Sequence, residues 1–241
     1  MLNFRTVCYF CGVLFSALLL SSCHNAKQEE QHDDGIQTGD LLFVGLPLDY
    51  HLTDSTSMDD AITSSTGREG EINYIHVAIL ERDELDSIWV IDATIKHGVH
   101  RHPFRVYLAD FTLNDGSYPV MDVMRLKDNT NATEYVNNAK TFVGRGYDMY
   151  FSSDNTEQYC SELVRNSYVT STGEYLFSEY PMNFKSEDGT YPPYWIELFG
   201  FLGEPIPQDE MGTNPKAMSQ ESCLMKVGTI TVDKGHVSID N

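Results

Sequence analysis

The chain has 241 residues and a formal net charge of −20, with 36 acidic side chains against 16 basic ones. A surface this acidic repels nucleic acid and anionic lipid headgroups, so charge excludes both as expected partners. The length suits one domain behind an N-terminal export segment, and the sequence contains no internal repeat or low-complexity block.

Residues 1–22 have the composition of a secretory signal peptide. A single basic residue, Arg5, precedes an apolar run that is shorter than the roughly 20 residues a membrane-spanning helix needs. Two serines then precede Cys23. This order resembles the lipobox of bacterial lipoproteins, whose cysteine is acylated after cleavage; an ordinary uncleaved or alanine-type signal is the alternative. We expect an exported lipoprotein anchored through Cys23, at the outer membrane because His24 replaces the Asp that causes inner-membrane retention in some bacteria.

The segment after the signal is polar and lacks apolar periodicity, which is typical of a flexible spacer. The sequence therefore predicts a signal peptide (1–22), a lipidated cysteine with a flexible linker (23–38) and one α+β domain (39–241) with an irregular C-terminal part. The cysteines of this domain are Cys160 and Cys223. They either form one disulfide or leave at least one free thiol.

The expected elements follow the apolar periodicity and the turn signals along the chain. Short runs rich in β-branched residues predict strands at 39–44, 74–80, 88–94 and 120–126. A polar turn joins the second and third of these strands as a β-hairpin. Helical spacing predicts helices near 58–62, over 132–143, and from 156–160 to 169. The proline-rich chain after Gly173 predicts loops, with a short helix near 194–199.

The hairpin carries two polar side chains within apolar runs. Side chains alternate between faces along a strand, so Tyr74, His76 and Ala78 point the same way. If the turn is centred on Glu84, His76 faces Asp92 across the ladder, at a separation that lets a carboxylate orient an imidazole. A slip of one residue in the pairing would put the two side chains on opposite faces.

Cys160 lies at the expected start of a helix. A helix N-terminus and a nearby imidazolium both favour the thiolate, which is the nucleophilic form of cysteine. With His76 as base and Asp92 orienting the ring, Cys160 would complete a catalytic triad, and its backbone N–H would help to bind an oxyanion. The alternative is a buried cysteine and a core histidine without a catalytic role.

Four motifs in fixed order resemble a known family: Gly39-Asp40-Leu41-Leu42-Phe43, Tyr74-Ile75-His76-Val77-Ala78-Ile79, Val90-Ile91-Asp92-Ala93 and Tyr159-Cys160-Ser161-Glu162-Leu163-Val164. The segment Gly144-Arg145-Gly146-Tyr147-Asp148, with Phe151 after it, precedes the last motif. Together they resemble the circularly permuted NlpC-type, papain-like cysteine amidases of the YiiX/YaeF branch. The resemblance covers residues 36–170, and its most specific part surrounds Cys160.

The resemblance implies a permuted papain-like fold, with an antiparallel sheet packed against helices that include the nucleophile helix. It implies Cys160 as nucleophile, His76 as base, and Asp92 where the family usually has the longer Glu. It also implies amide hydrolysis through a thioester acyl-enzyme, without a cofactor, on an envelope substrate such as a cell-wall stem peptide. An acyl-lipid or N-acyl amide hydrolase, an acyltransferase and a non-catalytic envelope binding module are the alternatives.

Other residues near the expected site allow two roles each. Tyr74 and Tyr159 would line a substrate pocket or donate to an oxyanion, or would pack in the core. Glu162 is expected to make structural hydrogen bonds away from the cysteine. The aromatic stretch 191–201 would pack in the core or line a groove.

Three histidines, His97, His100 and His102, give the spacing H-x-x-H-x-H close to Asp92, which is compatible with a metal site. Adjacent lysine and arginine side chains would repel a cation. We therefore expect a solvated loop here that leads into the next element, and no bound metal.

Overall fold

The computed structural model describes residues 35–46, 57–67, 71–113, 116–153, 155–233 and 236–240. The predicted signal peptide, the predicted lipidation site Cys23 and most of the predicted linker lie outside these residues. In the part of the chain that is described, no helix combines the length and the apolar character needed to cross a membrane.

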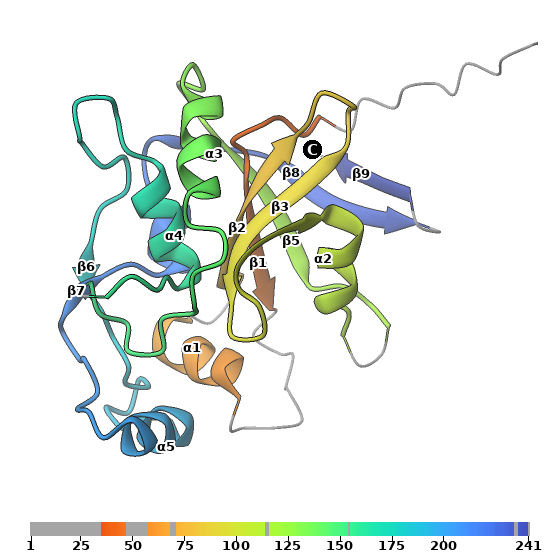
Figure 1. Ribbon diagram of the computed structural model, residues 1–241. Coiled ribbons are helices and arrows are strands. Elements are labelled where there is room, and N and C mark those ends of the chain that lie inside the picture. Colours follow the sequence, from red (N-terminus) through yellow and green to blue (C-terminus); the bar gives the residue numbers. More distant parts are fainter. Residues whose placement is uncertain are drawn as a thin grey trace, which may run out of the picture. The chain divides into compact units, whose positions relative to one another are not determined.

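The described chain forms a seven-stranded sheet in the order β4-β3-β2-β1-β5-β8-β9, in which all neighbouring strands are antiparallel (Figure 1). The strands are β1 (Leu41–Leu46), β2 (Asn73–Arg82), β3 (Ile88–Thr94), β4 (Gly98–Pro103), β5 (Val120–Leu126), β8 (Leu224–Asp233) and β9 (His236–Asp240). A separate short pair is formed by β6 (Tyr180–Pro181) and β7 (Met211–Gly212).

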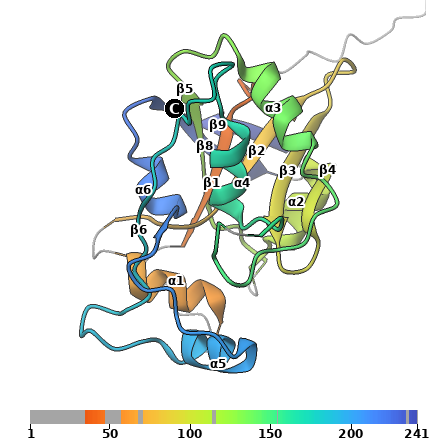
Figure 2. The ribbon, with the colours of Figure 1, turned by 60° about the vertical axis from the view of Figure 1, so that its left-hand side comes forward.

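Helices cover the two faces of the sheet. They are α1 (Met58–Thr66), α2 (Phe104–Asp110), α3 (Ala132–Lys140), α4 (Cys160–Ser167), α5 (Pro193–Leu202) and α6 (Pro215–Ser219). Helices α3 and α4 pack together on the same face, while α2 covers the other face beside β3 and β4. Figure 2 shows α1 and α5 side by side at one end of the domain, where they share a smaller apolar cluster.

Strand β1 shows how the sheet separates two cores. All six of its residues are buried: Leu41 and Phe43 pack with α3 and α4, and Leu42 and Val44 pack with α2. Because side chains alternate along a strand, a strand that is covered on both faces is apolar at almost every position. Burial on both faces accounts for the uninterrupted apolar run in the sequence of β1, and it agrees with the position of β1 at the centre of the sheet.

The predicted α+β architecture is confirmed. The strand at 39–44 appears as β1, the hairpin as β2 and β3, and the strand at 120–126 as β5. The four predicted helices appear as α1, α3, α4 and α5. Two predictions were wrong. Residues 98–103 form β4 instead of a solvated loop, and the C-terminal part expected to be irregular contributes β8 and β9 to the sheet.

Packing also begins earlier than the predicted domain start at residue 39. Ile36 is only 2% exposed and belongs to the core beneath α2. The Arg125 guanidinium donates to the carbonyl oxygen of Gly35 at 2.6 Å, and the backbone N–H of Gln37 donates to Asp40 at 2.8 Å. The described end of the predicted linker, residues 35–38, is therefore part of the folded domain.

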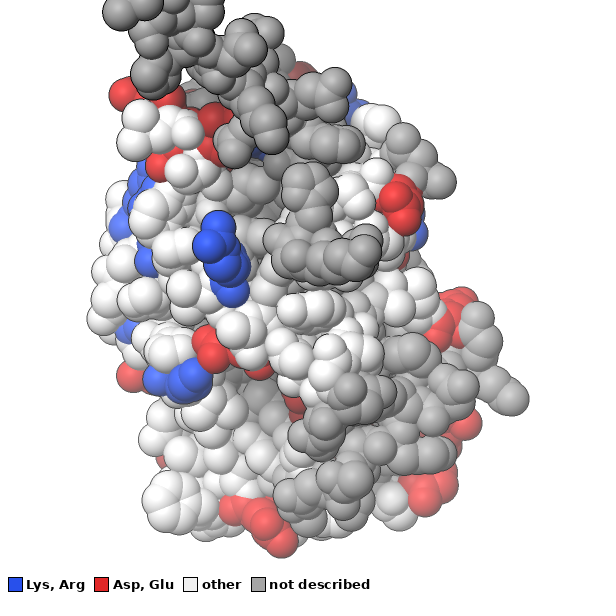
Figure 3. All heavy atoms as spheres, turned by 90° about the vertical axis from the view of Figure 1, so that its right-hand side faces the viewer, with Lys and Arg blue, Asp and Glu red and all other residues white. Residues whose placement is uncertain are grey.

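Acidic and basic side chains both occur on the face shown in Figure 3. Several basic side chains of the domain are paired with acidic ones, among them Arg101 and Lys140, which both contact Glu81. The excess negative charge of the chain thus lies on a surface whose basic groups are partly neutralised by local ion pairs.

Candidate active site

Helix α4 fixes the position of Cys160, its first residue. Leu163 and Val164, one turn further along, are fully buried and hold the helix against the sheet. The Glu162 side-chain oxygen accepts a hydrogen bond from the backbone N–H of Tyr159 at 3.3 Å, which caps the helix. Since a helix leaves its first N–H groups without intrahelical acceptors, the N–H of Cys160 is available to bind an anion.

His76 on β2 and Asp92 on β3 are in direct contact. The Nε2 atom of His76 lies 3.0 Å from Oδ2 of Asp92, and Asp92 is only 1% exposed. The assumed register was wrong: Glu81 pairs with Trp89, which centres the turn on residue 85. Continued by one pair, that register puts Asp92 opposite Ala78, two residues from His76 on the same face, so the shorter Asp side chain still reaches the ring.

The second ring nitrogen of His76 is left for Cys160, which hydrogen bonds to the imidazole. Burial disfavours the imidazolium of His76, but the electrostatic effect of Cys160 and the hydrogen bonds with Asp92 and Cys160 outweigh it. They raise the pKa of His76 from 6.5 to about 10. An imidazolium facing a thiolate is the charge arrangement that activates a cysteine nucleophile.

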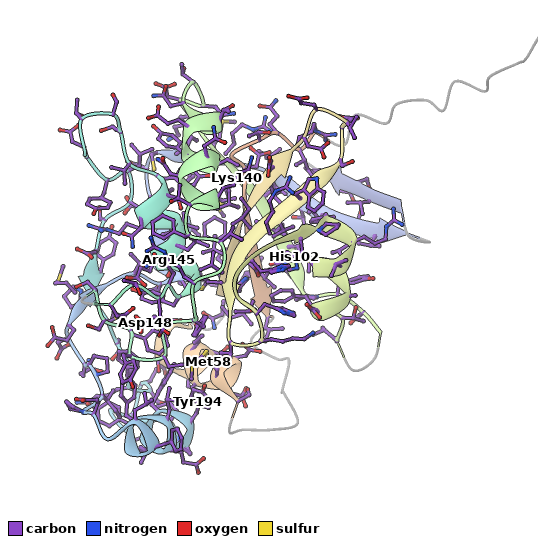
Figure 4. All side chains as sticks on the ribbon, in the orientation of Figure 1. Met58, His102, Lys140, Arg145, Asp148 and Tyr194 are labelled. Carbon is purple, nitrogen blue, oxygen red and sulfur yellow. The ribbon has the colours of Figure 1, made fainter. Side chains whose placement is uncertain are left out.

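Asp92 has a second imidazole neighbour that the sequence did not reveal. The Nε2 atom of His102, on β4, lies 3.1 Å from Oδ1 of Asp92, and the His102 side chain is 5% exposed (Figure 4). Burial alone would raise the pKa of Asp92, but the hydrogen bonds from His102 and His76 lower it below its ordinary value. Asp92 is therefore an ionised carboxylate with an imidazole on each oxygen.

Two hollows meet at Cys160. One has a volume of about 260 Å³ and contains His76, with a wall that is mainly apolar; it is lined by Met58, Asp59, Ile62, Ile75, His76, Ala93, Thr94, Ile95, Phe111, Tyr147 and Cys160. The other is more apolar and lies toward α5, with Phe151, Phe184 and Trp195 in its wall. Ile62, Ile75, Tyr147 and Cys160 line both. The thiol is therefore reached from two sides although Cys160 is only 6% exposed.

The two predicted substrate-binding tyrosines have different environments. Tyr159 lines the apolar hollow beside Cys160, and its hydroxyl accepts a hydrogen bond from the backbone N–H of Thr213 at 3.0 Å. Tyr74 lies on the opposite face from His76, where its ring packs on Phe43 and its hydroxyl donates to Asp122.

A β-bulge explains the position of Tyr74. Val44 pairs with His76, but the next residue of β1, Gly45, pairs with Tyr74, which leaves Ile75 unpaired. One extra residue inverts the alternation of faces beyond it. The expectation that Tyr74 and His76 share a face was therefore wrong, and the structure does not bring Tyr74 into the site.

The described residues contain no group of three His, Cys, Asp or Glu side chains placed to hold a metal ion. The Nε2 atom of His102 is bound to Asp92, and that of His97 contacts Asp110 at 3.3 Å. Two of the ring nitrogens that the H-x-x-H-x-H spacing would offer to a metal thus contact carboxylates. Cys160 and Cys223 are both free thiols, which resolves the alternative of a disulfide.

Comparisons with known proteins agree with this geometry. The family model described as "Permuted papain-like amidase enzyme, YaeF/YiiX, C92 family" matches residues 35–228. The chain belongs to this family. A search of curated proteins gave no match.

A solved structure supports the fold of this family member. The protein described as "metalloprotein yiiX from Escherichia coli O157:H7" aligns with a TM-score of 0.60 and 24% sequence identity, over 80% of this chain and 96% of that chain. The family match over residues 35–228 confirms the predicted relation to the permuted papain-like amidases, and this structure agrees with it in fold. The word "metalloprotein" in that description is said of the neighbour.

Proposed function

We propose that this member of the permuted papain-like amidases is a cysteine hydrolase that cleaves an amide bond through a thioester on Cys160. The observation that carries the proposal is the contact series from Cys160 to His76 to Asp92, at the meeting point of two hollows. His76 is the general base and acid, and Asp92 orients its ring.

In the acylation step, the Cys160 sulfur attacks the carbonyl carbon of the substrate amide and forms a C–S bond. The carbonyl electrons move onto oxygen, and the Cys160 N–H at the start of α4 stabilises the resulting oxyanion. The oxyanion then collapses and breaks the C–N bond. The His76 imidazolium transfers its proton to the departing nitrogen, so a neutral amine leaves and a neutral imidazole remains.

In the deacylation step, the neutral His76 takes a proton from a water molecule that attacks the thioester carbonyl. Collapse of the second tetrahedral species breaks the C–S bond, releases a carboxylic acid and restores the thiolate–imidazolium pair. Asp92 stays ionised throughout and stabilises the imidazolium through its 3.0 Å contact.

The substrate class follows from the predicted location. We propose that residues 1–22 are removed, that Cys23 carries the lipid, and that the domain stays on the periplasmic or surface face of the outer membrane. The polar segment between the anchor and the folded domain, residues 24–34, holds eleven residues, which reach ~40 Å at full extension. An envelope substrate, such as a cell-wall peptide, lies within this distance.

The apolar hollow favours a second candidate, a hydrolase or acyltransferase for acyl-lipid or N-acyl amides. Its wall beside Cys160 is built from Phe151, Phe184, Trp195 and Met182, which suit a hydrocarbon chain better than a polar peptide. An acyltransferase would differ only in the second step, where an acceptor hydroxyl or amine replaces water.

Thiol reactivity tests the catalytic proposal without knowledge of the substrate. Iodoacetamide is reacted with the full chain at neutral pH, and labelling of the Cys160 and Cys223 peptides is followed by mass spectrometry. Cys223 is an internal reference, because burial and Glu221 raise the pKa of its thiol. We expect faster labelling of Cys160, and slower labelling of Cys160 in His76→Ala and Asp92→Asn. Equal rates of Cys160 labelling in the wild type, His76→Ala and Asp92→Asn would contradict the catalytic proposal and favour a non-catalytic binding module.

A substrate panel identifies the bond that is cleaved. Wild-type protein and Cys160→Ala are incubated with peptidoglycan stem peptides and with N-acyl amides of different chain length, and products are analysed by mass spectrometry. A Cys160-dependent product from stem peptides supports the peptidase, and one from acyl amides supports the second candidate. Identical product profiles for the two proteins on both substrate classes would contradict amide hydrolysis.

A further inference from the structure

The carboxylate of Asp92 is held from both sides by imidazoles. Oδ2 lies 3.0 Å from Nε2 of His76, and Oδ1 lies 3.1 Å from Nε2 of His102. All three residues are buried, with exposures of 1% for Asp92, 8% for His76 and 4% for His102. Because the Asp92 carboxylate is ionised and only accepts hydrogen bonds, each imidazole presents an N–H to it.

One hydrogen bond does not fix a carboxylate. The terminal torsion of an aspartate side chain has a broad energy profile, so the group rotates easily about its Cβ–Cγ bond. A second donor on the other oxygen sets the plane of the carboxylate. Without His102, Oδ1 of Asp92 would also be a buried acceptor without a partner, which favours rotation toward any other donor.

We infer that His102 is a positioning residue of the cysteine site, which holds the Asp92 carboxylate in the orientation that faces His76. The inference rests on the proposed function, since it concerns the same site. With Nε2 of His76 held by Asp92, Nδ1 of that ring is directed to the Cys160 thiol. His102 thus acts on the nucleophile through two other side chains.

His102 is itself held by the fold. It pairs with Val90 in the ladder between β3 and β4, and its ring packs edge-on against Tyr107 of α2 at 5.7 Å. The other titratable groups around it are His97 and His100, whose ring centroids lie 6.4 and 5.4 Å away. On the far side of Asp92, the groups that face His76 include Cys160 of α4 and Asp59 of α1.

His100 provides a matched control. It lies two residues before His102 on the same face of β4, but its side chain is exposed. Asp92 is its register partner, yet the hydrogen bonds of Asp92 to imidazoles go to His76 and His102. Replacing His100 therefore changes the local histidine content without removing a donor from Asp92.

The experiment compares His102→Phe, His102→Gln and His100→Phe in the full chain. The rate of Cys160 alkylation by iodoacetamide is measured between pH 5 and 11, with Cys223 as internal reference. Phe keeps a planar ring but has no donor, whereas Gln keeps an N–H donor. We expect His102→Phe to slow alkylation at neutral pH by up to about 100-fold, the cost of displacing a catalytic group by about 1 Å. His102→Gln should recover part of the rate, and His100→Phe should match wild type.

The pH profile separates positioning from general damage. Asp92 helps to raise the pKa of His76 to about 10, so a misoriented carboxylate lowers the upper inflection of the profile toward neutral pH. A variant that is merely less stable would change its unfolding midpoint and leave this inflection in place. The inference is overturned if His102→Phe and His100→Phe give the same profile, or if His102→Gln is no better than His102→Phe.

Two further measurements keep the inference testable. If His76→Ala and Asp92→Asn also leave alkylation unchanged, the proposed function fails; if they slow it and His102→Phe does not, only the role of His102 fails. Should His102→Phe not fold, nitrogen-15 NMR of histidine-labelled wild-type protein reports the tautomer directly. A proton on Nε2 of His102 at neutral pH supports the inference, and a bare Nε2 overturns it.

Discussion

The Glu162→Gln substitution should make the protein more stable at alkaline pH and leave its stability at acidic pH almost unchanged. Glu162 is 8% exposed and caps the helix that begins with Cys160. Burial, together with the negative charges of Asp148 and Glu179, raises the pKa of this carboxyl from 4.5 to about 8. The amide oxygen of Gln can accept the same hydrogen bond from Tyr159, so the cap is preserved.

The sign of the effect follows from proton binding. Between pH 4.5 and about 8 the unfolded chain has released the Glu162 proton while the folded protein still holds it, so the free energy of unfolding falls as pH rises. Each unit of pKa difference corresponds to about 1.4 kcal/mol, which sets an upper limit of about 5 kcal/mol above pH 8. Partial hydration of the carboxyl reduces this, and we expect a gain of about 2–4 kcal/mol for Glu162→Gln at pH 9.

Urea unfolding at pH 5 and pH 9, at the same ionic strength, measures this difference. Glu134→Gln is the matched control, because Glu134 occupies the same third position of α3 but is exposed. The control should change stability by less than about 1 kcal/mol at either pH. If Glu162→Gln changes the free energy of unfolding equally at pH 5 and pH 9, the carboxyl does not titrate as the structure requires.

Two further substitutions test how the fold holds the site. Gly98→Ala should destabilise the protein by at least about 2 kcal/mol, because φ is +63° and a Cβ would lie 2.3 Å from the Arg145 carbonyl oxygen. Gly173→Ala is the control: its φ is +87° but its Cβ would meet open space, so it measures the cost of the backbone conformation alone in the same denaturation assay. Arg125→Met should cost about 3–5 kcal/mol, since it leaves the fully buried Asp40 without its two-point ion pair. Stability that is partly restored in the Asp40→Asn/Arg125→Met double variant would identify the unpaired charge as the cause, whereas no restoration would contradict it.

The sequence predicts the centre of this fold well because its strands and helices are strongly patterned. Strand β5 was placed at its observed bounds, and helix α4 was expected to begin in the region where Cys160 starts it. Strand β4 was missed for a physical reason. Its residues 98–103 include a single aliphatic side chain, Val99, and the sequence carries no periodic apolar signal for a strand whose buried side chain at position 102 is polar.

His102 shows why buried polar networks are difficult to predict. In the sequence it belongs to a histidine-rich segment that looks equally suited to a metal site or an exposed loop. The ladder between β3 and β4 places it beside Asp92, and only a buried carboxylate at that point makes a buried histidine favourable. Each residue of such a pair is stabilised by the other, so neither His102 nor Asp92 alone can be recognised as buried from the sequence.

The contact between His76 and Asp92 was predicted from an incorrect register, and the parity of a β-ladder explains why the contact survives. Moving the centre of the turn from residue 84 to residue 85 shifts each pairing by two positions, and a shift of two keeps every side chain on its face. The bulge at Ile75 adds one residue and does change the face, which is why Tyr74 points away from the site. An error of an even number of residues in the register keeps two predicted catalytic side chains on the same face of the sheet, whereas an error of an odd number puts them on opposite faces. The position of bulges therefore limits the prediction of this kind of site more than the position of the turn does.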